Sequence, residues 1–221
     1  MVTGLNNWNR IRKIRNQFHT RNPHAGNDGW LAEFERVIKP QTSLYRDRLI
    51  ILSDGPYSGV TACEMELDDA KWKSLSLRIR LEHECTHYFT KRVLGAMRNH
   101  VLDEILADYM GISAAAGAFR ADWFLKFFGL ENFPAYRRGG RLENYFGKNF
   151  VHANSIALLR QGVHQTAHVL ERLPYSGKER ILVLLALATT NLAEISGPRG
   201  YDLLRSTVDS LRAEVVFAQR E

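Results

Sequence analysis

Residues 81–94, LEHECTHYFTKRVL, and residues 100–111, HVLDEILADYMG, decide the fold of this chain. In both segments apolar side chains recur every three to four residues, as they do on the buried face of a helix. We expect the first helix to end at Gly95 and Asn99 to cap the second, which extends over about 101–128. Two helices joined by so short a turn pack antiparallel. The sequence therefore predicts that these two segments lie side by side.

Helices are also expected on both sides of this pair, at about 5–20, 28–38, 153–172, 178–195 and 201–218. The fourth of them is expected to begin with a capping box formed by Ser176 and Glu179. Residues 131–151 lack a regular apolar period and are expected to form a loop.

A small sheet is expected in the first third of the chain. Residues 49–52 form a short apolar run, and residues 61–67 alternate between apolar and polar side chains, which predicts a pair of strands. No internal repeat or linker interrupts the chain. The predicted fold class is therefore α+β: a mainly α-helical single domain of residues 1–221, with a small antiparallel sheet preceding the helix that starts near Leu81.

The composition is that of an ordinary globular protein, since 45% of the 221 residues are hydrophobic. No apolar run approaches the ~20 residues that cross a bilayer, and the N-terminus lacks the apolar stretch of a secretory signal. Cys63 and Cys85 are too few for a disulfide framework. We therefore expect a cytoplasmic protein with reduced thiols and no membrane partner.

The net charge is +6, and much of the excess lies near the N-terminus, at Arg10, Arg12, Lys13, Arg15 and Arg21. Such a cluster can attract nucleic acid or another anionic surface. The alternative is the solvated face of a helix whose other face is apolar. We adopt the second interpretation, because a run of charge alone is weak evidence for a partner, and nucleic acid is not an expected partner.

His83-Glu84-Cys85-Thr86-His87 fits the pattern H-E-x-x-H. One turn of helix takes ~3.6 residues, so two histidines four residues apart project from the same side toward one metal ion. Zinc binds imidazole nitrogen, whereas a neighbouring carboxylate that stays off the metal can accept a proton from water. We therefore predict His83 and His87 as zinc ligands and Glu84 as the general base. On this pentapeptide alone, a surface helix with scattered histidines remains the alternative.

A second cluster of acidic residues follows on the next expected helix. Glu104 and Asp108 are four residues apart and share one helical face. Antiparallel packing can bring Glu104 opposite the histidine pair, as the third protein ligand that a catalytic zinc requires. Asp108, and with it Asp103, can accept the remaining N–H of a metal-bound imidazole and fix its tautomer. The alternative is an acidic helix face in contact with solvent.

Together the two segments resemble the gluzincin metallopeptidases, the thermolysin-like group, whose pattern is H-E-x-x-H and, on the next helix, N-E-x-x-S-D-x-x-G. The resemblance is confined to residues 83–87 and 103–111, and Ala107 stands where the family has serine. The zinc ligands that the resemblance implies are His83, His87 and Glu104. The implied activity is a zinc-dependent peptidase.

The resemblance also implies roles for the residues around the ligands. Glu84 corresponds to the general base, and Asp108 to the acid that orients His83. Asp103 takes the place of the asparagine that orients His87. The spacing between the two segments is shorter than in thermolysin, which leaves the substrate class open.

A peptidase of this type needs a donor that stabilises the oxyanion of the tetrahedral intermediate. His164 and His168, four residues apart on the helix at 153–172, are the main candidates. Other candidates are His152, Tyr145 and Tyr109. For each of them an ordinary structural role is the alternative.

Two further expectations concern the surroundings of the motif. In gluzincins a strand beside the active-site helix often pairs with an extended peptide substrate, and residues 60–67 are the segment expected to do so here, unless they form an internal strand. Cys85 is expected to pack on the core side of the helix with Leu81 and Phe89, as neither ligand nor nucleophile.

The sequence as a whole predicts a zinc-dependent hydrolase with one Zn²⁺ per chain. We expect a peptidase that cleaves amide bonds in a peptide or protein substrate. The rival is a non-catalytic zinc-stabilised binding protein, which requires a closed site with a fourth protein ligand such as His164 or His168.

Overall fold

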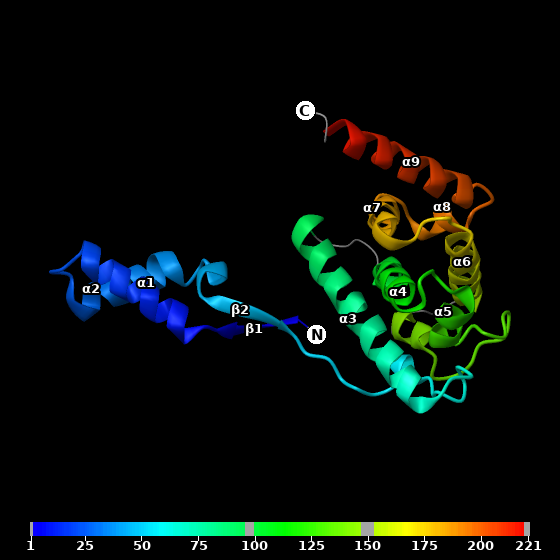
Figure 1. The fold of residues 1–221 in the computed structure, drawn as a ribbon, viewed down its shortest axis with the longest axis horizontal. Coiled ribbons are helices and arrows are strands. Elements are labelled where there is room, and N and C mark those ends of the chain that lie inside the picture. The colour runs from blue at the N-terminus through cyan, green and yellow to red at the C-terminus, as the bar shows by residue number, and fades with distance from the viewer. Residues whose placement is uncertain (1, 96–99, 147–152, 219–221) are drawn as a thin grey trace. The chain divides into compact units, whose positions relative to one another are not determined.

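The computed structural model describes residues 2–95, 100–146 and 153–218. Most of them are helical, and the described part contains one two-stranded antiparallel sheet, so the predicted α+β class is confirmed (Figure 1). The chain divides into two compact units, Met1–Ile51 and Leu52–Glu221. The expectation that residues 1–221 form a single domain stays a prediction.

The first unit combines the sheet with two helices. Its elements in chain order are β1 Val2–Asn6, α1 Trp8–Arg21, α2 Gly26–Glu33, a π-helical turn Phe34–Ile38, a 3-10 helix Thr42–Leu44 and β2 Arg46–Ile50. The strands pair antiparallel, with Val2 opposite Ile50 and Asn6 opposite Arg46. The first expected helix therefore starts later than predicted, because residues 2–6 belong to the sheet and the side chain of Asn7 caps α1 by accepting a hydrogen bond from the Arg10 amide.

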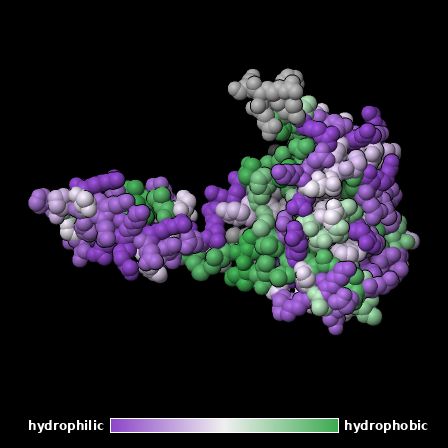
Figure 2. Space-filling model, viewed as in Figure 1, coloured by the Kyte–Doolittle hydropathy of each residue, from purple (hydrophilic) through white to green (hydrophobic). Residues whose placement is uncertain are grey.

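Aromatic side chains hold the first unit together. Phe18 packs on Trp30 with ring centroids 5.7 Å apart, Trp30 on Phe34 at 5.5 Å, and Phe34 on Tyr45 at 5.8 Å. Such tilted pairs each add roughly 0.5–1.5 kcal/mol beyond the area that they bury. The face of this unit visible in Figure 2 is mostly hydrophilic.

The prediction of a strand at residues 61–67 is wrong. Residues 62–66 form turns, in which Leu67 N–H donates to the Ala62 carbonyl and Glu66 has a left-handed backbone (φ 56°). Ala62 and Met65, three residues apart, are buried while Cys63, Glu64 and Glu66 are exposed, so burial in this segment does not follow the alternation that predicted a strand. Consequently, residues 60–67 offer no strand for a peptide substrate to pair with.

The second unit is helical. Its α-helices are α3 Asp69–Val93, α4 His100–Ala116, α5 Ala121–Phe128, α6 Ala153–Glu171, α7 Arg180–Ala188, α8 Leu192–Ser196 and α9 Gly200–Ala218. Short 3-10 helices cover Tyr57–Gly59, Arg141–Tyr145 and Gly177–Glu179. The predicted helices at 153–172 and 201–218 are thus confirmed within two residues at each end.

Three boundaries differ from expectation. α3 is helical from Asp69 onward, where its N-cap Asp68 accepts from the Lys71 amide, so the helix expected to start near Leu81 begins well before that residue. The helix expected at 101–128 breaks at Gly117 (φ 87°) into α4 and α5. The helix expected at 178–195 is likewise divided into two, α7 and α8.

The prediction of a capping box at Ser176 and Glu179 is wrong. The Ser176 side chain makes no capping hydrogen bond, and the capping box of this region is formed at α8 by Asn191 and Glu194. Asn99, expected to cap α4, lies outside the described residues.

α3 and α4 pack antiparallel, as predicted. Opposing residues show this directly: Gly111 lies against Ile79, Asp108 against His83, and Glu104 against His87. A Cβ atom at Gly111 would stand 2.7 Å from the Ile79 carbonyl oxygen, so only glycine permits this close approach of the two backbones. The helix pair therefore brings the two motifs of the sequence together.

The core of the second unit surrounds α4 and α5. Ile105, Leu106, Phe124, Phe127 and Phe128 have no exposed surface. Phe124 and Phe128 pack with ring centroids 4.4 Å apart. Within the described ranges, no helix combines the length and the apolar content that a membrane span requires.

Candidate metal centre

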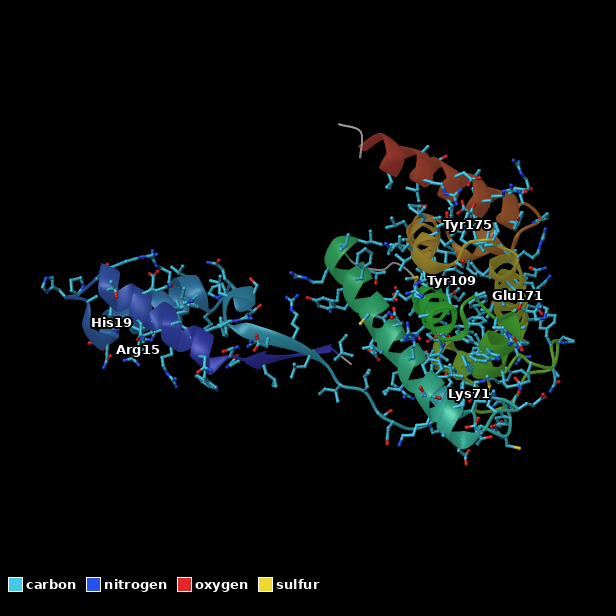
Figure 3. All side chains as sticks on the ribbon, in the orientation of Figure 1. Arg15, His19, Lys71, Tyr109, Glu171 and Tyr175 are labelled. Atoms are coloured by element: carbon cyan, nitrogen blue, oxygen red, sulfur yellow. The ribbon has the colours of Figure 1, made fainter. Side chains whose placement is uncertain are left out.

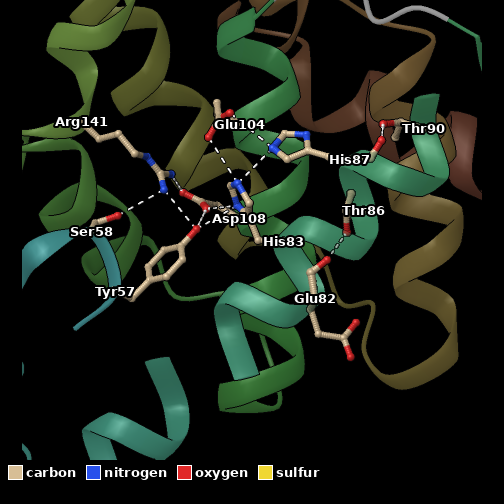
Figure 4. Close-up of polar contacts among 10 residues, drawn as sticks. All are labelled: Tyr57, Ser58, Glu82, His83, Thr86, His87, Thr90, Glu104, Asp108 and Arg141. Atoms are coloured by element: carbon tan, nitrogen blue, oxygen red, sulfur yellow. Dashed lines mark hydrogen bonds and ion pairs between the residues drawn. The ribbon is translucent and has the colours of Figure 1, made fainter. Parts of the chain in front are cut away.

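Two imidazoles and one carboxylate meet between α3 and α4 (Figure 4). His83 Nε2 and His87 Nε2 lie 3.0 Å apart, Glu104 Oε2 lies 3.5 Å from His83 Nε2, and Glu104 Oε1 lies 3.3 Å from His87 Nε2. Among the residues that the structure describes, this is the only group of three His, Cys, Asp or Glu side chains whose donor atoms all lie within 4.8 Å of one another. The three predicted ligands are thus brought to one place.

The spacing of the donor atoms fits a tetrahedral zinc ion. Ligand atoms about 2.05 Å from such an ion lie about 3.3 Å from one another. The two Nε2 atoms, 3.0 Å apart, and the two oxygens of Glu104, each 3.3 or 3.5 Å from one of them, have separations close to that value. Both imidazoles present Nε2, and nitrogen lone pairs facing each other are stabilised by a proton or a cation between them. The residues present therefore fit a zinc ion.

Asp108 fixes the orientation of His83. Its Oδ1 lies 2.8 Å from His83 Nδ1 and accepts a 2.6 Å hydrogen bond from the Tyr57 hydroxyl. With Nδ1 donating to the carboxylate, the proton of a neutral His83 is held on Nδ1, and Nε2 keeps its lone pair toward Glu104 and His87. The structure thus places Asp108 where the sequence predicted it.

Arg141 holds the other side of the Asp108 carboxylate. Its guanidinium forms an ion pair with Asp108 Oδ2 and donates to the Tyr57 hydroxyl (3.1 Å) and to Ser58 Oγ (3.2 Å). The guanidinium also stacks over the Phe128 ring, 4.8 Å from its centroid. Asp108 is fully buried, so this cation provides the charge that a carboxylate in such a place requires.

The neighbouring charges shift the pKa values of the site. Burial by itself would raise the pKa of Asp108, but the Arg141 charge and the His83 hydrogen bond outweigh it and lower that pKa. For Glu104 burial also acts to raise the pKa, and His87 and His83 outweigh it, so the pKa is lowered. For His87 burial is outweighed by Glu104, Asp103 and Glu84, and its pKa is raised. At neutral pH both carboxylates are therefore ionised and attract a cation.

Glu84 and Asp103 lie near His87. Both are half-buried, and the charges of both help to raise the pKa of His87. Their predicted roles, general base and orienting acid, depend on contacts with water and with His87, and both roles stay predictions.

The expected oxyanion donors are distributed differently. Tyr145 lies close enough to the cluster for the Glu104 carboxylate to affect it. Burial raises the pKa of Tyr145 most, and the charge of Glu104 raises it further. Tyr109 faces the core, where it is 1% exposed and packs on Phe119 with ring centroids 5.5 Å apart (Figure 3). His164 and His168 lie on α6, and neither belongs to the group of His83, His87 and Glu104. His152 lies outside the described residues.

Cys85 does not pack in the core. Its side chain is exposed, as is that of Leu81, so the prediction for Cys85 is wrong. The buried side of α3 carries His83, Thr86 and Thr90 instead. Because one helical turn separates His83 from His87, Cys85 between them points away from α4.

Sequence reasoning missed Tyr57, Ser58 and Arg141. Tyr57 and Ser58 lie in a 3-10 helix ahead of α3, and Arg141 begins another after α5. Neither segment has a motif or an apolar period that relates it to the H-E-x-x-H helix. An arginine that directly follows two glycines, Gly139 and Gly140, in an expected loop was the one local sign of a special position.

Residues 1–199 match the model of the family of unknown function DUF7005. The chain belongs to this family. The match includes the first unit and every residue of the candidate metal centre, so it extends over residues of both units. Neither a curated protein nor a solved structure matches the chain significantly.

Proposed function

We propose that this DUF7005 protein is a zinc-dependent hydrolase, and specifically a peptidase that cleaves amide bonds. The observation that supports it most is the meeting of His83, His87 and Glu104 at separations near a zinc tetrahedron, with Asp108 on the far side of His83. A scattered set of surface histidines would have neither the third donor nor the buried carboxylate behind the first.

In the proposed reaction Zn²⁺ supplies Lewis acidity, which lowers the pKa of water and polarises a scissile carbonyl. His83, His87 and Glu104 hold the ion, and Asp108 keeps His83 in the tautomer that presents Nε2. Glu84, on the same helix, accepts the proton of the attacking water and later passes it to the leaving amine. Tyr145, beside Glu104, is the best placed of the expected oxyanion donors.

The rival function is a zinc-stabilised protein that catalyses nothing. Such a site is closed by a fourth protein ligand. In the described part of the chain the group has three members, and the two histidines named for the fourth position lie outside it. This favours a site with a position left for water and substrate. A cytoplasmic location remains part of the proposal, supported by the low cysteine content.

The experiment separates metal binding from chemistry. Chain loaded with one equivalent of Zn²⁺ is incubated with unfolded casein and with a fluorogenic peptide mixture. Glu84→Gln is expected to keep its zinc and lose at least about 10²-fold in turnover, as removal of a general base does. His83→Ala is expected to lose both zinc and activity.

The matched control is Glu82→Gln. Glu82 is also half-buried on α3, but it faces Arg180 at 3.8 Å. It should leave zinc content and turnover within about twofold of the unaltered chain, since such an ion pair contributes little. Undiminished hydrolysis by Glu84→Gln would refute the role of Glu84 as general base. Hydrolysis by the unaltered chain in the absence of zinc would refute the role of the metal.

A further inference from the structure

A second pair of imidazoles lies on α6, outside the site of the proposed function. His164 and His168 are four residues apart, and their Nε2 atoms lie 3.4 Å from each other. Two ligands of a tetrahedral zinc ion, each about 2.05 Å from it, are separated by about 3.3 Å. The pair therefore has the separation that one shared metal ion requires.

The rings are held in this arrangement by their neighbours. His164 stacks on Phe133, with ring centroids 4.2 Å apart and an angle of 20° between the planes. On the other ring, Nδ1 of His168 lies 3.9 Å from a carboxylate oxygen of Glu171, which projects from α6 (Figure 3). A carboxylate near Nδ1 favours the tautomer that carries its proton there and leaves Nε2 as the metal donor.

The pair is also accessible to solvent. It lines an open cleft of about 530 Å³ between α6 and the turn from α8 to α9. The nearby guanidinium of Arg172 lies over the Tyr201 ring, 4.4 Å from its centre. A metal ion can therefore enter without displacing any core side chain.

We propose that His164 and His168 form a second transition-metal site, which binds Zn²⁺, Ni²⁺ or Cu²⁺ through both Nε2 atoms. Imidazole selects these borderline ions over Mg²⁺ or Ca²⁺. With two protein ligands, the remaining positions belong to solvent, so the ion exchanges readily and binds more weakly than at the three-ligand cluster. The site is independent of the hydrolase proposal.

Isothermal titration of metal-free chain tests the proposal, with Zn²⁺, Ni²⁺ and Cu²⁺ in separate runs. The unaltered chain is expected to bind two equivalents with different affinities. Binding at the weaker site should be tightest for Cu²⁺, in line with the general order for nitrogen ligands. His164→Ala and His168→Ala should each weaken only that site, by roughly 10²-fold, because one imidazole loses the advantage of a linked partner.

His24→Ala is the matched control. His24 is an exposed histidine of the first unit, outside both groups, and its removal should leave both equivalents unchanged. The His168 side chain is 51% exposed, so His168→Ala should not disturb folding. His168→Ala therefore tests the site even if His164→Ala, which loses the stack on Phe133, fails to fold. Far-ultraviolet circular dichroism checks that each variant is folded.

The outcomes separate the two proposals. If His168→Ala titrates like the unaltered chain, the second site does not exist. If the unaltered chain binds one equivalent that His83→Ala abolishes, the second site is refuted and the hydrolase is untouched. If that single equivalent survives His83→Ala and disappears in His168→Ala, the metal of the proposed hydrolase is refuted instead.

Discussion

Asp108→Asn removes one charge from the centre of the buried network and changes almost nothing in shape. Asp108 is fully buried and forms an ion pair with Arg141, accepts from Tyr57 and faces His83 Nδ1. The amide leaves the guanidinium without its carboxylate, and a broken buried pair costs about 3–5 kcal/mol. For a unit of this size that lowers the melting temperature by roughly 6–20 °C, at about 2–4 °C per kcal/mol.

The same substitution should weaken zinc binding. A neutral amide accepts the His83 N–H less strongly and makes the ring a poorer donor, for which losses of about 10–100-fold in affinity are usual. Both effects are measurable on one sample, by differential scanning calorimetry of the metal-free chain and by competition for Zn²⁺ with a chromophoric chelator.

Asp122→Asn provides the control, because Asp122 pairs with Arg120 at the surface, where the two side chains are 58% and 49% exposed. The loss there should stay within about 1 kcal/mol, with zinc affinity unchanged. If Asp108→Asn melts no lower than Asp122→Asn and binds zinc as tightly as the unaltered chain, the network neither stabilises the unit nor orients the ligand.

Three further predictions rest on the same helix pair. Gly111→Ala places a Cβ atom 2.7 Å from a carbonyl oxygen of α3, where ordinary contact begins at 3.4 Å; overpacking of about 1–3 kcal/mol should exceed the ~1 kcal/mol gained in helix propensity. Calorimetry should show a lower melting temperature, and competition with a chelator should show weaker zinc binding. A rise in both the melting temperature and the zinc affinity would contradict the close approach of the two backbones. Tyr57→Phe removes a hydroxyl that donates to Asp108, and thermal unfolding should show a loss of about 1–2 kcal/mol with a smaller effect on zinc than Asp108→Asn has. Because the pKa of His87 is raised above 6.5 and the pKa values of Glu104 and Asp108 are lowered below 4.5 and 3.8, His87 stabilises the metal-free chain below pH 6.5 and the two acids do so above pH 4.5. Denaturant unfolding should therefore show this contribution declining as pH rises past 6.5 and as it falls below 4.5, and a flat profile would refute it.

The meeting of His83, His87 and Glu104 could be predicted because helical periodicity and a short connection together place these residues on facing sides of two helices. His83 and His87 share a face of one helix, Glu104 and Asp108 share a face of the next, and a short connection makes the two helices antiparallel. Opposed in this way, each residue of the first pair meets one of the second. Local sequence therefore carried all the information that this contact needs.

The remainder of the network could not be predicted, since it depends on contacts between distant loops. Tyr57 and Arg141 are 84 residues apart, yet they share a hydrogen bond. Neither sits in a segment whose pattern relates it to α3. The small sheet was misplaced for a similar reason: its strands pair residues 2–6 with 46–50, and five-residue strands give too few alternations to reveal a partner.

The charge balance of the site leaves a place for one cation, which can be a proton or a metal ion. Glu104 and Asp108 contribute two negative charges, and Arg141 neutralises one of them. The other can be balanced by a proton on His87, whose raised pKa reflects this demand, or by a cation among the three donor atoms. A proton and Zn²⁺ thus compete for the same place. Zinc affinity should then increase as pH rises past 6.5 through the raised pKa of His87, and one proton should be released per ion bound at pH values below that pKa. Calorimetric titration in two buffers of different ionisation enthalpy counts that proton, and binding without release would show that the cation takes another position.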